Sequence, residues 1–441
     1  MAHTTLTEPD PVVAARAPAP APHGALAHAH SIGWHEAREL AAELGLRYGR
    51  ASRRASADGA TEEVLLAEAV GRVLAADVCA SADLPRFATA AMDGWVLSSC
   101  SPGGSIVDGS ATAWEVHAGI AAGDLPSATS MALGSARPIC TGAPVPPGGA
   151  AVLRSELGEI SVDRAGRSWL RSTHPVRPAE HIRPAGEEAR QGEILLRASA
   201  SLTPPQIALA AAAGRDTLTV VRRPTVDLLL LGDELARNGH PRGGQVRDAL
   251  GPAVPAIVAA LGLQLSHVRY VPDDPAVTIA ALQETTADVV LTTGGSSHGA
   301  ADHVRGALRV LGARLVFDGV AMRPGHPVIL AALPDGRPVL CLPGNPLAAL
   351  VCLTTLALPL VDAILGRLPR RSALSVAGAV LGNRTHSTRL IACVETVTGL
   401  SPVDWQGSGM LRGLAHADML AVVPPGGVRA GEPVHTVSLL W

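Results

Sequence analysis

Residues 287–312 read ADVVLTTGGSSHGAADHVRGALRVLG and contain, in order, an apolar run, a glycine-rich turn and a helical pattern. The run 287–293 has the apolar centre VVL, as expected for a strand buried on both faces of a parallel sheet. Val304, Leu308 and Leu311 recur at helical spacing and predict a helix after the turn. The segment therefore predicts one strand-to-helix unit of an α/β sheet.

Similar units lie on both sides of this segment. The runs VDLLLLG at 226–232 and RPVLCLPGNP at 337–346 predict two more buried strands, and GPAVPAIVAALG at 251–262 predicts a helix between them. Because strand and helix alternate, we predict a doubly wound parallel sheet and a three-layer α/β/α domain over 216–370. The apolar stretch 348–365 contains a proline and an aspartate, and we interpret it as a buried helix, not a membrane span.

The rest of the chain predicts further domains around this one. Residues 1–32 are rich in Ala, Pro and His and predict a disordered tail. The patterns at 34–44, 62–75 and 203–214 predict helices, with Thr203 as a cap, in an elongated helical linking domain built from 33–80 and 178–215. Short apolar runs broken by Gly, Pro and Ser predict an inserted, mainly β domain over 81–177 and a small C-terminal β domain over 371–441.

Composition excludes several classes of function. The 441 residues carry a formal charge of −3, which disfavours nucleic acid as a partner. The chain has no lysine, so all its basic residues besides histidine are arginines, and an Arg in place of a Lys is weak evidence of changed chemistry. The six cysteines form no CxxC pair, and the N-terminus lacks a signal-peptide pattern, so we expect a cytoplasmic protein without a membrane anchor.

Candidate ligand residues follow the predicted strands, where open α/β sheets bind ligands. Gly294 and Gly295 precede a helix whose N-terminus favours an anion, although an ordinary tight turn explains the glycines equally well. Asp233, Asp248 and Asp302 would suit magnesium with a phosphate ligand if the sheet brings them together; read singly, each is a helix cap or turn residue. No P-loop, GxSxG or HExxH motif is present.

Motifs along almost the whole chain after the tail resemble the MoeA/gephyrin E-domain family. They follow in the family's order and at comparable spacing: LPRFATAAMDGWV at 84–96, CTGAPVPPGGAAVLRSE at 140–156, HIRPAGEEARQGE at 181–193, LLGDEL at 230–235, TTGGSSHGAADHV at 292–304, MRPGHPV at 322–328, LPGNPLAAL at 342–350 and QGSGMLRGLAHAD at 406–418. Each motif alone is modest, but together they make the resemblance specific.

The resemblance implies an elongated homodimer whose α/β domain binds molybdopterin. It implies a molybdopterin molybdenumtransferase that takes adenylylated molybdopterin and molybdate, releases AMP and uses Mg²⁺, with possible contacts to other cofactor-assembly proteins. The implied catalytic residues are Asp93, Asp233, Asp302 and Arg323. The implied metal ligands are Asp233, Asp248, Asp302 and Glu188. The implied cofactor-binding residues are Gly294, Gly295, Ser296, Ser297, Gly299, His326, Pro343, Gly344, Asn345, Pro346 and Ser408.

Several positions depart from the family pattern and leave a second function open. Hydrophobic or small residues stand where the family usually has polar ones at four positions: Leu231, Leu250, Ala300 and Ala348. His326 replaces the second Lys of a KPGKP turn, and Gln206 stands where a Glu is common. The alternative to the transferase is a catalytically weakened paralogue that carries molybdopterin or molybdate. His326 itself is either an anion ligand or a surface turn residue without a ligand role.

Overall fold

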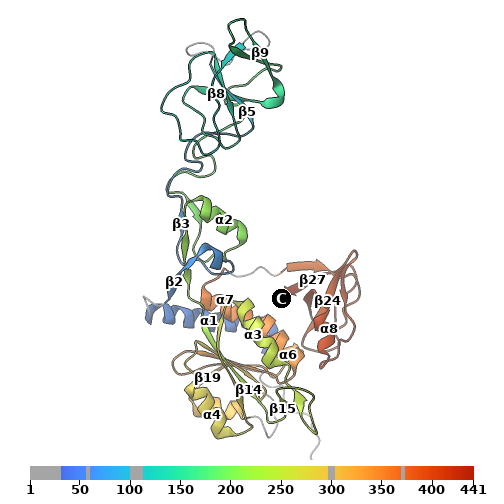
Figure 1. Ribbon diagram of the computed structural model, residues 1–441. Coiled ribbons are helices and arrows are strands. Elements are labelled where there is room, and N and C mark those ends of the chain that lie inside the picture. The colour runs from blue at the N-terminus through green and yellow to red at the C-terminus, as the bar shows by residue number, and fades with distance from the viewer. Residues whose placement is uncertain (1–30, 56–59, 100–112, 296–302, 369–372) are drawn as a thin grey trace, which may run out of the picture.

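The computed structural model describes residues 31–55, 60–99, 113–295, 303–368 and 373–441. Within these ranges the chain is elongated, with an α/β domain and a C-terminal β sheet at one end and a separate β domain at the other (Figure 1). A narrow segment of paired strands connects the two ends. The multidomain α/β fold expected from the sequence is confirmed.

The α/β domain is built on a six-stranded sheet. Its order is β17 (Gln264–Val271), β14 (Thr225–Leu231), β18 (Val289–Thr293), β22 (Pro338–Leu342), β21 (Ile329–Ala332) and β19 (Arg314–Asp318). The first four strands are parallel and the last two pair antiparallel. The strands predicted at 226–232, 287–293 and 337–342 are the three central parallel ones, which explains their continuous apolar character.

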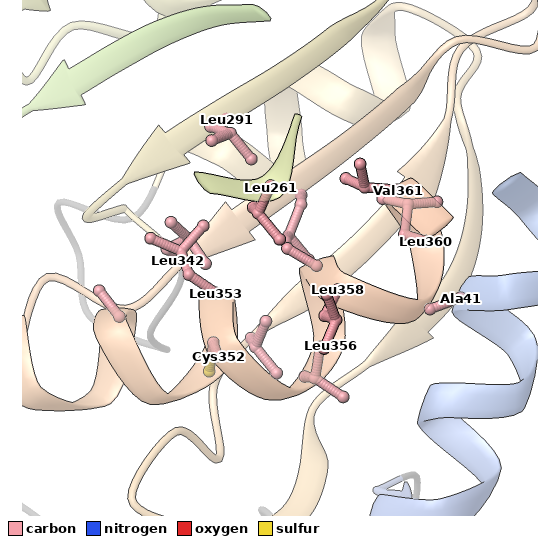
Figure 2. Packing of buried hydrophobic residues seen from close by; sticks show 14 of the residues in the cluster. Ala41, Leu261, Leu291, Leu342, Cys352, Leu353, Leu356, Leu358, Leu360 and Val361 are labelled. Atoms are coloured by element: carbon pink, nitrogen blue, oxygen red, sulfur yellow. The ribbon is translucent and has the colours of Figure 1, made fainter. Parts of the chain in front are cut away.

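Helices cover both faces of this sheet. On one face lie α3 (Leu250–Leu261), α6 (Pro346–Cys352), a π-helical turn (Leu353–Ala357) and α7 (Leu358–Leu365). On the other lie α4 (Pro275–Glu284) and α5 (Val304–Val310). Figure 2 shows Leu291 and Leu342 of the sheet packed with Leu261 and Leu358 of the helices. The apolar run Pro346–Leu365 is 89% buried in the fold, so it is a core helix, as expected.

Helix α1 (Trp34–Ala55) forms where the sequence predicts a helix, but it packs against α7 in the α/β core. Glycines permit this contact: a Cβ on Gly49 would lie 2.5 Å from the carbonyl oxygen of Ile364, and Gly45 approaches the carbonyl of Leu360 in the same way. The assignment of 33–55 to the linking domain stays a prediction, although this helix packs on the α/β core. Helical periodicity marked the buried face of α1 without indicating its partner.

The linking segment is made mostly of strand pairs: β2 (Thr61–Leu65) with β13 (Thr217–Val221), β3 (Val78–Cys79) with β12 (Ile194–Leu196), and β4 (Thr89–Ala90) with β11 (Ile182–Arg183). The helix predicted at 62–75 is wrong, because 61–65 pairs with a strand about 150 residues away and only Leu66–Glu68 forms a 3₁₀ turn. The helix predicted at 203–214 is confirmed as α2 (Pro204–Ala212), which Thr203 and Gln206 cap together.

The other two domains are β sheets. The inserted domain has the order β8 (Gly149–Arg154), β5 (Gly94–Ser98), β7 (Ser135–Ile139), β6 (Ala113–Val116), β10 (Ser168–Ser172) and β9 (Gly158–Val162), with a 3₁₀ turn at Ser155–Leu157. The C-terminal sheet has the order β1 (Ile32–Gly33), β20 (Val320–Arg323), β24 (Thr388–Thr396), β26 (Met419–Val423), β27 (Pro433–Ser438) and β23 (Ala373–Val376); β25 (Gly399–Pro402) also pairs with β24, and helix α8 (Leu411–Ala415) follows it. Two of its strands thus come from outside 371–441. The other predicted domain limits remain predictions.

Candidate functional site

Glycines and backbone groups gather at the carboxyl ends of β14, β18 and β22. Gly294 has a φ of +81° and its N–H donates to the carbonyl of Leu342 over 3.1 Å. A Cβ on Gly294 would lie 2.8 Å from the carbonyl oxygen of Leu231, and one on Gly344 would lie 3.5 Å from Gly294 Cα. A side chain fits poorly at Gly294, which explains that glycine, whereas the space at Gly344 would admit a Cβ. Gly294, Gly295, Pro343 and Gly344 are therefore brought together, as the sequence predicts.

A cavity of about 680 Å³ opens beside this edge, between the α/β domain and the C-terminal sheet. Its walls are the turn 322–327, the start of α6, and the segments 382–392 and 405–420, and the predicted residues Arg323, His326, Pro343, Asn345 and Ser408 all line it. Asn345 joins the two domains. Its Oδ1 accepts from the N–H of Ala348 (3.2 Å), which caps α6, and its Nδ2 donates to the carbonyl of Ser408 (2.9 Å).

The cavity wall is cationic. Arg323, Arg384 and Arg389 line it, and among the described lining residues none is Asp or Glu. Arg323 on β20 pairs in register with Arg389 on β24, so strand pairing sets the two arginines side by side. Arg389 donates to the carbonyl of Gly382 over 2.7 Å. Three guanidinium groups that line one cavity suit an oxyanion, which they can hold through paired hydrogen bonds.

Sequence reasoning missed Arg384 and Arg389. The segment GNRTHSTR at 382–389 is basic and begins with a glycine, but no local pattern ties it to the MRPGHP turn. Only the pairing of β20 with β24 joins the two segments.

A buried asparagine holds the loop that carries Arg384. Asn383 Nδ2 lies within hydrogen-bond distance of the carbonyls of Ser387 (2.9 Å), Val423 (3.0 Å) and Pro424 (3.0 Å). Its Oδ1 accepts from the N–H (3.0 Å) and the hydroxyl (2.8 Å) of Thr385. The loop conformation is therefore fixed by side-chain bonds, and the position of the Arg384 backbone with it.

His326 lines the cavity with a fixed ring. Its Nδ1 lies 2.8 Å from the carbonyl of Val320, and since a carbonyl only accepts, Nδ1 carries the proton. The turn packs closely on α6, because a Cβ on Gly325 would lie 2.7 Å from Cys352 Sγ. His326 is half-buried in the cavity wall, and its role as an anion ligand stays a prediction.

Of the three predicted metal-binding aspartates, Asp233 and Asp248 lie in the part of the chain that the structure describes. Asp233 is exposed, and its N–H lies 3.4 Å from a carboxylate oxygen of Asp273. Asp248 is buried, and its carboxylate accepts from the N–H groups of Leu250 (2.9 Å) and Gly251 (2.8 Å) and from the Tyr270 hydroxyl (2.8 Å). Asp248 is thus a cap at the start of α3, which is the alternative that sequence left open, and it has little capacity left for a metal.

Asp302 lies outside the described residues, as do Ser296, Ser297 and Gly299. Among the side chains that the structure describes, no three or more His, Cys, Asp or Glu form a group that could hold a metal ion.

Asp93 and Glu188 lie far from the cavity of their own chain. Asp93 directly precedes β5 in the inserted domain, at the opposite end of the molecule (Figure 1). The N–H (2.6 Å) and then the hydroxyl (2.9 Å) of Thr141 donate to its carboxylate and lower its pKa. Glu188 is exposed, and its N–H donates to the carbonyl of Leu84 (2.9 Å) in the segment next to that domain.

Several departures from the family pattern have structural explanations. Leu250 and Leu231 are buried in the two cores that flank the sheet, so they contribute packing at these positions. Ala348 offers its N–H to Asn345 at the start of α6. Gln206 accepts from the Thr203 N–H (2.9 Å) in a capping box of the linking segment. Ala300 lies outside the described residues.

Comparison with known proteins finds similarity along nearly the whole described chain. Residues 32–214 match the MoeA N-terminal region (domain I and II), 227–363 match a probable molybdopterin binding domain, and 383–439 match the MoeA C-terminal region (domain IV). A molybdopterin molybdenumtransferase of Synechococcus elongatus is 32% identical over 393 residues, which cover 86% of this chain and 95% of the relative. The enzyme of the same name from Staphylococcus aureus is 29% identical over 389 residues, covering 86% and 90%.

A solved structure has the same fold. The molybdopterin biosynthesis MoeA protein of Pyrococcus horikoshii OT3 superposes with a TM-score of 0.73 at 22% identity, covering 92% of this chain and 100% of that one. At this identity the likeness concerns the fold alone.

The fold and the site together define a multidomain α/β protein that presents a cationic cavity between its α/β domain and its C-terminal sheet. With matches over three consecutive regions and a relative at 32% identity, the chain belongs to the MoeA family. It is a transferase that acts in molybdenum cofactor biosynthesis.

Proposed function

We propose that this chain is a molybdopterin molybdenumtransferase that inserts molybdate into adenylylated molybdopterin with release of AMP. The observation that carries the proposal is the cavity lined by Arg323, Arg384 and Arg389 without a described carboxylate. Both substrates are anions, and three permanent positive charges beside a strand-end glycine edge favour them over neutral ligands.

Different residues of the cavity would bind different parts of the substrates. The arginines would hold oxyanion groups and offset negative charge that builds up as the adenylate leaves. His326, whose Nδ1–H is donated to the Val320 carbonyl, would present the remaining part of its ring to the cavity. Gly294 and Gly344 would allow a phosphate to approach the backbone at the ends of β18 and β22.

We propose that the enzyme uses Mg²⁺, which the described residues fit in part. Mg²⁺ in enzymes commonly uses one or two carboxylates together with substrate phosphate oxygens. Asp233 is exposed at the end of β14 and could supply such a carboxylate, as could Asp302, whereas Asp248 is occupied by three hydrogen bonds. We therefore propose that the ion arrives with the phosphate.

We propose a homodimer in which the inserted domain of one chain completes the site of the other. The resemblance implies Asp93 and Glu188 as site residues. Within one chain, however, Asp93 belongs to the inserted domain, which lies at the far end from the cavity (Figure 1), and Glu188 belongs to the segment next to that domain. A second copy could bring them to it. The test is co-expression of Asp93→Asn with Arg389→Ala. A mixed dimer contains one site with both native residues, so it should regain activity that neither variant has alone. No gain in a purified mixed dimer would contradict the shared site.

The alternative of a weakened paralogue that only carries molybdopterin or molybdate is not favoured. Two of the positions that suggested it, Leu250 and Gln206, hold a core residue and a capping residue, so these two say little about lost chemistry. We place the protein in the cytoplasm, where it would receive its substrate from other cofactor-assembly proteins.

The decisive experiment is rescue of nitrate reductase activity in a bacterial strain that lacks its molybdenumtransferase. Wild type should restore activity, Arg389→Ala should not, and Arg164→Ala, at an exposed turn of the inserted domain, should behave as wild type. Purified protein should release AMP from adenylylated molybdopterin only when molybdate is added. Failure of the folded wild type in both assays would refute the proposal and leave the carrier function.

A further inference from the structure

The cavity has a second, chemically different part. Trp405 and Met410 line it and remain 43% and 49% exposed, and buried aliphatic side chains from α6 and the C-terminal domain lie beneath them: Leu347, Val351, Leu390, Leu414 and Leu420. One cavity thus combines three arginines with an apolar surface that includes an aromatic ring. A ligand that satisfies both parts must carry an anionic group and a flat, largely apolar one.

The backbone at Trp405 is held in an unusual conformation. Its φ is +58°, a region that non-glycine residues seldom adopt. The next residue anchors it, because Gln406 Nε2 donates to the carbonyls of Ala392 (2.7 Å) and Val403 (2.9 Å). Helix α8 presses on the other side: a Cβ on Gly413 would lie 2.7 Å from the carbonyl oxygen of Trp405. The surrounding structure therefore imposes this conformation, as is common at ligand sites.

The ring itself is supported from one side. The guanidinium carbon of Arg412 lies 3.6 Å from the ring centroid of Trp405, while Trp405 lines the cavity and Arg412 is not among the lining residues. The cation covers one face of the indole and restricts its rotation. The rest of the ring stays available to a ligand in the cavity.

We propose that Trp405 is a stacking platform for a fused heteroaromatic ring whose attached phosphate is bound by Arg323, Arg384 and Arg389. The inference rests on the proposed function, since adenylylated molybdopterin carries two such rings, a purine and a pterin. Stacking of a base on an aromatic side chain tolerates different rings, because each has a π face. Trp405 would therefore orient the ring while the arginines hold the phosphate.

Calorimetric titration of the full chain tests this with three probes: AMP, neopterin monophosphate, and ribose 5-phosphate as the ring-free control. We expect Trp405→Leu to weaken AMP, neopterin monophosphate, or both by about fivefold or more, and to leave ribose 5-phosphate unchanged. Trp405→Phe should keep most of the affinity. Trp441→Leu removes another exposed indole, outside the cavity lining, and should change nothing.

Each outcome decides the proposal. Loss confined to AMP assigns the purine, and loss confined to neopterin monophosphate assigns the pterin. Equal loss of ribose 5-phosphate would mean a structural role, and no loss with any ring would mean that no platform exists; both overturn the proposal. If wild type rescues nitrate reductase while Trp405→Leu binds every probe normally, only this inference fails. If Trp405→Leu shows the expected loss but wild type does not rescue, only the proposed function fails.

Discussion

Replacing Asn383 by alanine should destabilise the C-terminal sheet and weaken anion binding together. The amide provides two N–H donors, shared among three carbonyls, and one oxygen that accepts from Thr385. Each hydrogen bond contributes about 0.5–1.5 kcal/mol net, and buried groups left without partners add to the loss, so we expect about 2–4 kcal/mol. Because Asn383 is only 3% exposed, water cannot readily replace the amide.

The assay has two readouts on the same purified variants. Urea unfolding followed by circular dichroism gives the loss of stability, and hydrogen exchange of residues 382–392 reports whether the loop has opened. Molybdate titration under conditions in which the protein remains folded reports the position of Arg384. Asn238→Ala, at an exposed loop position of the α/β domain, is the matched control and should change stability by less than about 0.5 kcal/mol.

Two results would refute this reasoning in different ways. Equal stability of Asn383→Ala and Asn238→Ala would show that the hydrogen bonds of Asn383 contribute nothing net. A destabilised Asn383→Ala with unchanged molybdate affinity would show that the loop does not position the cationic wall of the cavity.

Three further predictions follow from single contacts. Gly49→Ala should destabilise the protein by about 1–2 kcal/mol, because the added Cβ would meet a backbone carbonyl of α7. Gly306→Ala, in α5, should stabilise it by about 0.5–1 kcal/mol, because the space around this glycine is open. Thermal unfolding measures both changes, and shifts of equal sign would contradict the packing of α1 on α7. Arg389→Lys should keep more molybdate affinity than Arg389→Ala, and equal loss would mean that bidentate geometry rather than charge decides binding. At pH 8 Cys140, which is exposed, should react with maleimide, and Cys341 should not. Burial raises the pKa of Cys341 to about 12, so almost none of this thiol is ionised at pH 8 and its thiolate forms only as pH approaches that value. Mass spectrometry of native protein would detect the opposite order, which would contradict the prediction.

The sequence determined the α/β domain by itself. Strands buried on both faces of a parallel sheet are mostly apolar, so VDLLLLG, ADVVLTTGG and RPVLCLPGNP indicate strands from the sequence alone. The glycine and asparagine at the ends of these strands could also be interpreted from the sequence. Gly294 has a φ of +81° in the turn after β18, and Asn345 caps α6; both are local requirements.

Local patterns failed where a distant segment decided the outcome. Residues 62–65 have helical composition but form a strand, because β13 offers a pairing edge about 150 residues later. Asp248 reads as a possible metal ligand, yet Tyr270 and the start of α3 use its carboxylate.

The cationic cavity is also a product of tertiary structure. Arg323 and Arg389 are 66 positions apart and become neighbours only because β20 leaves the α/β domain to pair with β24 in the C-terminal sheet. The position of α1 was equally hidden, since its apolar face shows that it is buried but not that glycines fit it to α7. Hydrophobic period is a property of neighbours along the chain and can be read from the sequence. Strand partners and helix contacts depend on the free energy of the whole packed molecule, and only the tertiary structure decides them.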